Sequence, residues 1–360
     1  MRTFSVELGP KTHPVHVGTG LLDRLGELAR DARLRPGRAM LVTDSNVGPL
    51  YAERALAALA DAGFKAAMME IAAGEASKSL ATLSSAYDRM AEAELDRQSA
   101  VFALGGGVVG DLAGFAAATF MRGVALVQVP TTVVAAVDSS LGGKTGVNHP
   151  RAKNLIGAFY QPRMVVADVS TLKTLGEREF REGLAEVIKY GAIMDAPMIA
   201  DLEHGLGAIL SREPEALEAI VERSLRHKAF VVERDEHESG LRKILNFGHT
   251  VGHAIEAWAG YGSYLHGEAV AVGMVAAAKL SRAYAGLGEA ETARLEALIR
   301  GAGLPVALPS GWRGEQFARA LRLDKKRVDE GVEFVLLDRL GHAFTKRLSF
   351  DEIVASLAPS

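Results

Sequence analysis

Short apolar runs in the first half of the chain alternate with helical patterns, and each run stops at residues that favour turns. One run ends at Asp44, another at Gly105 and a third at Pro130. Strand, turn, helix and strand in succession are typical of an α/β domain with a largely parallel sheet. The pattern predicts a helix at residues 51–62 and buried strands at residues 39–43, 100–104, 124–129 and 164–167.

The second half has a different character, because long helical patterns replace the strands. A chain of 360 residues is long enough for two domains. We expect a Rossmann-like domain at residues 1–176 and an all-helical domain at residues 177–360, with the active site in the cleft between them. The helical patterns cover residues 179–194, 214–233, 249–259, 268–285 and 289–302.

Composition excludes several classes of protein. With 48% hydrophobic residues and a formal net charge of -3, the chain is neither disordered nor a typical nucleic-acid binder. No apolar stretch is long enough to span a bilayer, and the N-terminus does not look like a signal peptide. The sequence contains no cysteine, so a metal site must use His, Asp or Glu. We expect a cytoplasmic protein without membrane or nucleic-acid partners.

A glycine-rich loop follows the second predicted strand. Gly105, Gly107 and Gly110 have the GxGxxG spacing that lets backbone N–H groups approach a pyrophosphate at a helix N-terminus. The acidic residue expected about 20 positions later is missing, so a tight strand-to-helix turn is an equal alternative. Asp44, after an earlier strand, is a candidate for the ribose contact or simply a turn former.

Several cations are candidates for anion binding. Lys144 follows two glycines, but Asp138 stands where a P-loop needs glycine, so that motif is excluded. Lys228, Arg242 and the pair Lys325–Lys326 could neutralise a phosphate or carboxylate, with a solvated helix face as the alternative for each.

The strongest local signal is a histidine cluster. His249 and His253 lie four residues apart, and His266 follows, so a helix would place the first two on one face. Neutral imidazoles at that spacing suit Zn²⁺, but spacing alone does not choose between His253 and His266. Glu186 and Lys189 share a helical face, which an ordinary ion pair would explain.

Taken in order, these segments resemble the 3-dehydroquinate synthase family of the shikimate pathway. The resemblance runs from about residue 44 to residue 326 and rests on an ordered set of short motifs. These motifs are GGGVVGD at residues 105–111, PTT at 130–132, DSSLGGKTGVN at 138–148, KNLIG at 153–157, EVIK at 186–189, LNFGHTVGH at 245–253 and HGE at 266–268.

The resemblance implies both cofactors and the residues around them. Glu186, His249 and His266 would bind a divalent metal, with zinc expected and cobalt as the alternative, and His253 would contact substrate. NAD contacts would be Asp44, Asn46, Glu75, Lys78, Gly107, Val108, Val109, Gly110, Asp111, Thr131, Thr132, Lys144, Lys153, Thr171, Leu172, Lys173 and Thr174. Substrate contacts would be Arg122, Asp138, Lys144, Asn154, Lys189, Lys228, Arg242, Asn246, His253 and Lys325.

The resemblance also implies the reaction and a homodimer. The family converts 3-deoxy-D-arabino-heptulosonate 7-phosphate to 3-dehydroquinate and phosphate by transient oxidation, elimination, re-reduction, ring opening and aldol closure. The arginine that matches Arg122 would reach the site across the dimer interface. The alternatives are a related cyclase of the aminodehydroquinate or deoxy-scyllo-inosose type, a metal-dependent alcohol dehydrogenase, and a non-catalytic NAD-binding protein.

Overall fold

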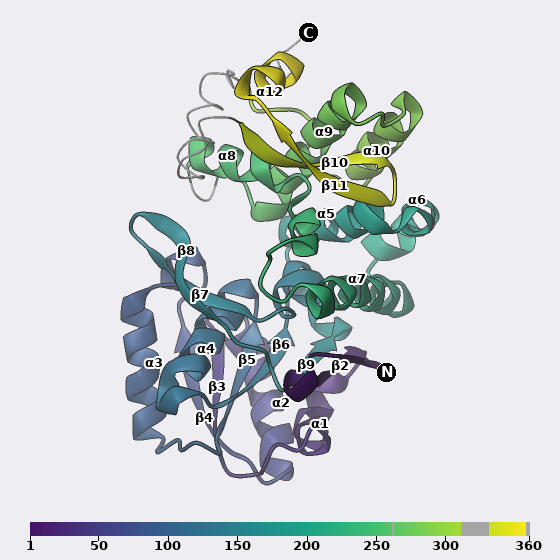
Figure 1. Ribbon diagram of the computed structural model, residues 1–360. Coiled ribbons are helices and arrows are strands. Elements are labelled where there is room, and N and C mark those ends of the chain that lie inside the picture. Colours follow the sequence, from purple (N-terminus) through teal and green to yellow (C-terminus); the bar gives the residue numbers. More distant parts are fainter. Residues whose placement is uncertain (261–262, 311–330, 358–360) are drawn as a thin grey trace. The chain divides into compact units, whose positions relative to one another are not determined.

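A computed structural model describes residues 1–260, 263–310 and 331–357 of the chain (Figure 1). Contacts divide the chain into two compact units, Met1–Leu175 with Pro214–His237 and Gly176–Glu213 with Glu238–Ser360. The segment Pro214–His237 was expected in the second domain but belongs to the first unit. Its helix packs on the N-terminal strands, where the Arg226 guanidinium lies 4.5 Å from the ring centroid of Phe4.

A mixed, mostly parallel sheet organises the first unit. Within the described residues it has seven strands in the order β1-β2-β9-β6-β5-β3-β4, and only the β1–β2 pair is antiparallel. The strands are β1 (Arg2–Val6), β2 (His13–Gly18), β3 (Arg38–Asp44), β4 (Lys65–Ile71), β5 (Ala100–Gly105), β6 (Ala125–Pro130) and β9 (Met164–Asp168). The four predicted strands, now β3, β5, β6 and β9, are therefore confirmed.

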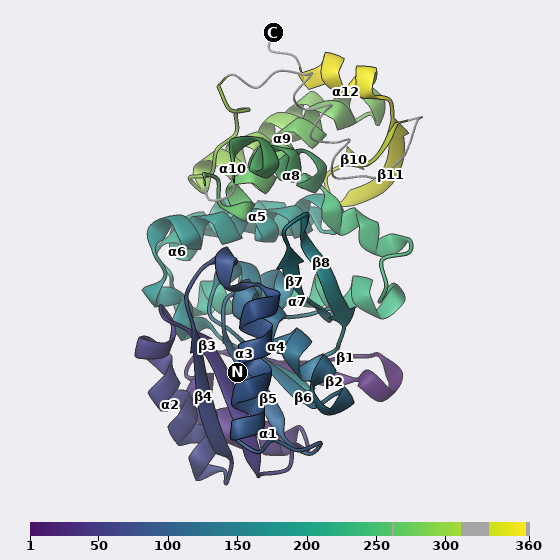
Figure 2. The ribbon, with the colours of Figure 1, turned by 90° about the vertical axis from the view of Figure 1, so that its left-hand side faces the viewer.

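Helices cover both faces of this sheet (Figure 2). Successive residues of a strand face opposite ways, so Leu41 joins the core under α1 and α2, while Met40 joins the core under α3 and α4. Burial on both faces explains why these strands appear in the sequence as continuous apolar runs. The helices of this unit are α1 (Leu25–Asp31), α2 (Gly48–Asp61), α3 (Leu80–Glu92), α4 (Gly107–Thr119) and α7 (Pro214–Arg234).

An antiparallel hairpin that the sequence analysis did not predict lies against α4. Its strands are β7 (Lys144–His149) and β8 (Ala152–Phe159). Val147 of β7 packs in the same apolar cluster as Leu112 and Ala116 of α4. The hairpin therefore holds Asn154 close to α4, where Lys78 contacts both Asn154 and Asp111.

Short helical turns connect these elements. In the described part of the chain they are 3-10 turns at Gly9–Lys11, Leu21–Arg24, Glu75–Ser77, Phe120–Arg122, Val169–Thr174 and Leu241–Asn246, and a π-helical turn at Ala135–Ser139. Several of these turns carry predicted site residues. Turns at strand and helix ends leave side chains and backbone groups accessible to ligands.

The second unit is mainly helical, as predicted, with one β-hairpin. Its described helices are α5 (Glu177–Met194), α6 (Ala196–Leu210), α8 (His249–Ala259), α9 (His266–Tyr284), α10 (Glu289–Gly301) and α12 (Phe350–Leu357). The hairpin β10 (Val332–Arg339) and β11 (His342–Leu348) corrects the expectation of an all-helical domain. Phe334 and Leu336 of β10 pack into the core with Val272 of α9. None of the described helices is long and apolar enough to cross a membrane.

Glycines let α9 approach its neighbours closely. A Cβ on Gly267 would lie 1.9 Å from the carbonyl oxygen of Glu182 on α5, and a Cβ on Gly273 would lie 1.9 Å from that of Gly248, just before α8. Since no side chain fits at either point, the three helices pack with backbones nearly in contact. This packing brings the starts of α8 and α9 next to α5.

We predict that Gly267→Ala destabilises the protein, because the new Cβ collides with backbone that cannot move independently. The free energy of unfolding should fall by about 1–3 kcal/mol in urea titrations. Gly205→Ala on α6 is the matched control, since nothing lies within 4 Å of its added Cβ. A Gly267→Ala variant as stable as the control would contradict this close packing.

Candidate active site

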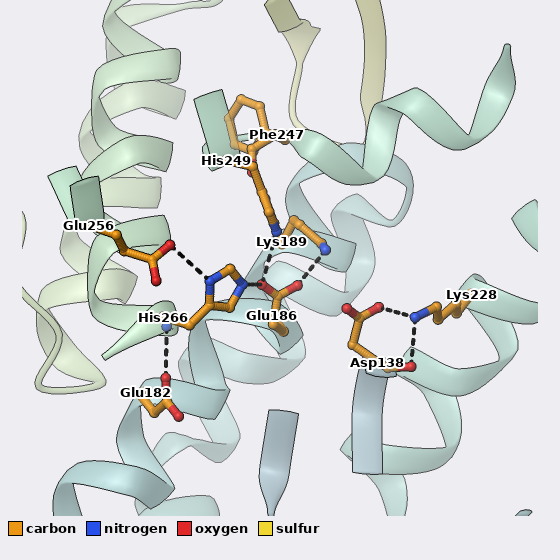
Figure 3. Close-up of polar contacts among 10 residues, drawn as sticks. Asp138, Glu182, Glu186, Lys189, Lys228, Phe247, His249, Glu256 and His266 are labelled. Atoms are coloured by element: carbon orange, nitrogen blue, oxygen red, sulfur yellow. Dashed lines mark hydrogen bonds and ion pairs between the residues drawn. The ribbon is translucent and has the colours of Figure 1, made fainter. Parts of the chain in front are cut away.

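A carboxylate and two imidazoles converge in the second unit (Figure 3). Glu186 lies on α5, while His249 and His266 are the first residues of α8 and α9. The Nε2 atoms of both histidines lie 3.6 Å from Glu186 Oε1. Glu186 is 0% exposed, so the carboxylate meets these rings in a nearly dry environment.

The local sequence fixes the start of each histidine helix. Gly248 adopts a left-handed conformation with φ of 81°, which turns the chain into α8 at His249. At the start of α9, the Glu182 carboxylate accepts a hydrogen bond of 2.7 Å from Gly267 N–H. Glu268 accepts another of 2.9 Å from Leu265 N–H. These carboxylates stabilise the helix N-terminus, so His266 projects from a backbone held on both sides.

The three side chains fit a divalent metal ion. The ligand atoms of Glu186, His249 and His266 all lie within 4.8 Å of one another. Ligands about 2.1 Å from a tetrahedral Zn²⁺ stand about 3.4 Å apart, close to the observed 3.6 Å separations. One carboxylate and two imidazoles also form a donor set that leaves a fourth position for substrate, as catalytic zinc sites do.

The two histidines differ in their electrostatics. Burial lowers the pKa of His249 to about 3, so its ring is neutral, and its Nδ1 lies 3.2 Å from the carbonyl oxygen of Phe247. Burial also lowers the pKa of His266, but its interactions with Glu186 and Glu256 outweigh that effect and raise it to about 10. A metal ion would therefore replace a proton on His266.

The structure groups the two candidates that spacing left open with different partners. Glu186 groups with His249 and His266, whereas His253 groups with Glu256 and His266. His253 is exposed, and its ring centroid lies 5.5 Å from that of His249. His253 therefore lies beside the three-residue cluster rather than within it.

Three further predicted residues belong to the same unit. Lys189 is 1% exposed and pairs with Glu186, so the predicted ion pair exists inside the cluster. The turn Leu241–Asn246 carries Arg242, which is 2% exposed, and Asn246, whose Nδ2 donates to Glu238 Oε1 at 2.8 Å. Glu238 was not singled out from the sequence, because an exposed-looking acid after a helix gives no periodic signal.

In the first unit, the glycine-rich loop forms the N-terminus of α4. The helix begins at Gly107, after Gly106 in the N-cap position. A Cβ on Gly106 would lie 3.0 Å from Thr132 Cγ2, so the loop and the Thr131–Thr132 segment are in contact. Thr131 N–H donates to Gly105 O at 3.0 Å, which joins the ends of β5 and β6.

A buried lysine links that helix to the hairpin. Lys78 is 5% exposed, and its Nζ lies 2.5 Å from Asp111 Oδ2 and also donates to Asn154 Oδ1. Burial raises the pKa of Asp111. Asn148 extends the network, since its Nδ2 donates to Glu75 Oε1 at 2.7 Å and its Oδ1 accepts from Asn154 N–H at 2.8 Å. These NAD and substrate candidates thus form one polar network.

A second ion pair in this unit joins Asp138 and Lys228. Lys228 Nζ lies 2.7 Å from Asp138 Oδ1 and donates to the Asp138 carbonyl at 2.6 Å (Figure 3). Lys228 is 5% exposed. The pairing brings two predicted substrate residues together and fixes α7 against the turn that carries Asp138.

Further NAD candidates lie in turns of the first unit. Asp44 Oδ1 accepts from Asn46 N–H and Val47 N–H, the turn-forming role that the sequence left as an alternative. Thr171 and Thr174 lie together in one 3-10 turn, where the Thr174 hydroxyl lies 2.7 Å from the Tyr51 hydroxyl.

Three candidate cations lie near or at the surface, and one lies outside the described residues. Arg122 and Lys144 are exposed, whereas Lys153 is partly exposed. Arg122 has a φ of 69°, which is unusual for arginine. Lys325 and its alternative Lys326 lie outside the described residues.

Comparison with known proteins identifies relatives along most of the chain. Residues 68–182 match the 3-dehydroquinate synthase N-terminal family, and residues 183–327 match its C-terminal family. The chain is 51% identical to 3-dehydroquinate synthase of Desulforamulus reducens, over 95% of each chain. It is 53% identical to that of Pelotomaculum thermopropionicum, over 96% of this chain and 93% of the relative.

Solved structures of other cyclases share the fold. A 2-deoxy-scyllo-inosose synthase complexed with carbaglucose-6-phosphate, NAD⁺ and Co²⁺ has a TM-score of 0.90 and 27% identity, over 99% of each chain. A 2-epi-5-epi-valiolone synthase from Streptomyces hygroscopicus with NAD⁺ and Zn²⁺ bound has a TM-score of 0.87 and 30% identity, over 98% of this chain and 96% of that one. The curated relatives are more similar in sequence, and the chain belongs to the 3-dehydroquinate synthase family.

Proposed function

We propose that the protein converts 3-deoxy-D-arabino-heptulosonate 7-phosphate to 3-dehydroquinate and phosphate, in the shikimate pathway that leads to aromatic amino acids. Full-length identity of 51% and 53% to curated 3-dehydroquinate synthases supports this lyase activity. The structural observation that carries the proposal is the cluster of Glu186, His249 and His266, because a scaffold or regulatory protein needs no such donor set. We expect the enzyme in the cytoplasm.

Each proposed cofactor has a candidate binding site in one of the two units. NAD would lie on the first unit, where the N-terminus of α4 offers N–H groups to its pyrophosphate. It would take up a hydride from the substrate and return it later in the same turnover. Zn²⁺, or Co²⁺ in its place, would be bound by Glu186, His249 and His266 and would polarise a substrate oxygen.

The charged residues of the chain suit the groups of this substrate. Lys144, Asn154 and His253 are proposed to bind the phosphate, whose own oxygen would accept the C6 proton during elimination. Lys228 and Arg242 are proposed to bind the carboxylate; both are at most 5% exposed, so their charges are little screened. Asp138 and Lys189 would orient ring hydroxyls, and Asn246 and Lys325 complete the proposed set of substrate contacts.

A substrate carboxylate separates this proposal from its nearest rival. Glucose 6-phosphate, the substrate class of inosose-forming cyclases, has no carboxylate for the contacts that are proposed for Arg242 and Lys228. Aminated heptulosonates retain the carboxylate, so the aminodehydroquinate alternative differs only at the substituent. A metal-dependent alcohol dehydrogenase would differ in outcome, because its NADH would leave the enzyme.

A homodimer is part of the proposal, with Arg122 reaching the site of the partner subunit. Arg122 is exposed on its own chain and follows Met121, which is also exposed and also has a positive φ. Two successive non-glycine residues with positive φ are energetically unfavourable, and proteins retain such strain mainly at functional sites. A dimer interface at this turn would be such a site.

We predict that phosphate release from the heptulosonate substrate proceeds without net NADH accumulation, because the hydride is returned in each turnover. Phosphate is measured by a coupled assay and NADH by absorbance, with glucose 6-phosphate as the comparison substrate. His249→Ala serves as the inactive control, since it removes a proposed metal ligand. Faster turnover of glucose 6-phosphate, or one NADH for each substrate consumed, would contradict the proposal.

We predict that Arg122→Ala and His249→Ala chains, each inactive alone, regain activity when mixed. In a heterodimer, one of the two sites receives both intact residues, so equal mixing should restore about a quarter of wild-type activity. Subunit exchange is verified by mass spectrometry of differently tagged chains. Complete exchange with no recovery would show that Arg122 does not act across an interface.

A further inference from the structure

Glu256 is a carboxylate next to the proposed metal cluster that has no role in the function described so far. It lies on α8, two turns after His249, and its side chain is only 11% exposed. Its Oε2 atom lies 3.5 Å from His266 Nδ1 (Figure 3). A nearly buried carboxylate that faces an imidazole is costly unless the two interact.

The His266 ring therefore lies between two carboxylates, one at each nitrogen. Glu256 faces Nδ1 at 3.5 Å, whereas Glu186 faces Nε2 at 3.6 Å. A neutral imidazole carries one N–H and one lone pair, and an acceptor at one nitrogen selects the tautomer protonated there. With Glu256 as acceptor at Nδ1, the lone pair of Nε2 is directed toward Glu186 and His249.

We propose that Glu256 is a positioning residue that holds His266 as the Nδ1–H tautomer and aims its Nε2 at the metal. Carboxylates of this kind commonly orient metal-binding histidines and raise their basicity. The inference rests on the proposed metal site and extends it by one residue. The HTVGHAIE segment thus supplies both a ligand, His249, and the group that orients the ligand from the next helix.

The backbone of His266 has its own, separate support. Glu182 and Glu268 accept the N–H groups of Gly267 and Leu265, so the peptide at the start of α9 is held without Glu256. Removing Glu256 should therefore free the ring while leaving the helix start intact. A change in metal affinity after removal of Glu256 can therefore be assigned to the His266 ring and not to the start of α9.

One competing role for Glu256 is direct metal binding. His253, Glu256 and His266 also bring ligand atoms within 4.8 Å of one another. In that arrangement Glu256 would be a ligand on the Nδ1 side of His266 and would hold an ion of its own. The number of ions bound per chain distinguishes this role from positioning.

The test compares Glu256→Ala and Glu256→Gln with the wild-type full-length protein. Zn²⁺ affinity is measured by competition with a chromophoric chelator, and bound zinc is counted by elemental analysis. We expect Glu256→Ala to bind one ion with about 10- to 100-fold weaker affinity. Glu256→Gln should lose less, because its amide oxygen still accepts a hydrogen bond. Glu203→Gln, which removes an ion pair with Arg294 in the same unit, is the matched control and should bind as wild type does.

A second measurement separates positioning from general damage to the fold. Melting temperatures are recorded without metal and with saturating Zn²⁺, because a ligand stabilises only as strongly as it binds the folded state. A structural defect would lower both values equally, whereas a positioning defect reduces the increase that zinc causes. The absorption spectrum of bound Co²⁺ should also change in Glu256→Ala, since the ligand field depends on ring orientation.

The outcomes are distinct. If the wild type binds zinc and both Glu256 variants bind equally well, the positioning role is wrong and the metal site stands. If the wild type binds two ions and the variants bind one, Glu256 is a ligand and the inference is overturned. If neither the wild type nor any variant binds zinc, the metal site itself fails and takes this inference with it.

Discussion

The site in the second unit depends on one buried carboxylate. Glu186 is fully inaccessible to solvent, and burying a charge is strongly unfavourable unless cations or hydrogen-bond donors surround it. Lys189 pairs with the carboxylate from the same helix, and two imidazole nitrogens approach from α8 and α9. A divalent ion would complete this compensation and would use the same three side chains. The charge of Glu186 therefore requires α5, α8 and α9 to keep these nitrogen-bearing side chains beside the carboxylate.

Close helix packing makes that convergence possible. Gly267 and Gly273 allow α9 to lie almost against the backbones of α5 and the start of α8. Both histidines occupy the first position of their helices, where a fixed backbone leaves little freedom except rotation of the ring. The inferred contact from Glu256 would remove much of that remaining freedom. The glycines and the carboxylate around the histidines thus determine where the two imidazole rings lie.

Sequence reasoning was most effective where periodicity was strong. The predicted strands at β3, β5, β6 and β9 are confirmed, since parallel strands buried on both faces give continuous apolar runs. The hairpins β7–β8 and β10–β11 were missed. Strands β8 and β11 are largely exposed and carry little apolar signal, whereas the buried apolar run of β10 was overlooked. Spacing placed His249 and His253 on one helical face but could not show that His266, from a separate helix, reaches the same Glu186 oxygen as His249. Glu238 and Glu256 also depend on tertiary contacts that no local pattern encodes.

Anomalous scattering from crystals of the zinc-loaded protein tests directly whether Glu186, His249 and His266 together hold one ion. Data collected on either side of the zinc absorption edge locate the ion without reference to the chain. We expect one peak per chain, about 2.0–2.2 Å from a Glu186 oxygen and from Nε2 of both histidines. A peak bound instead by His253 and Glu256, or no peak near Glu186 in fully loaded protein, would contradict it.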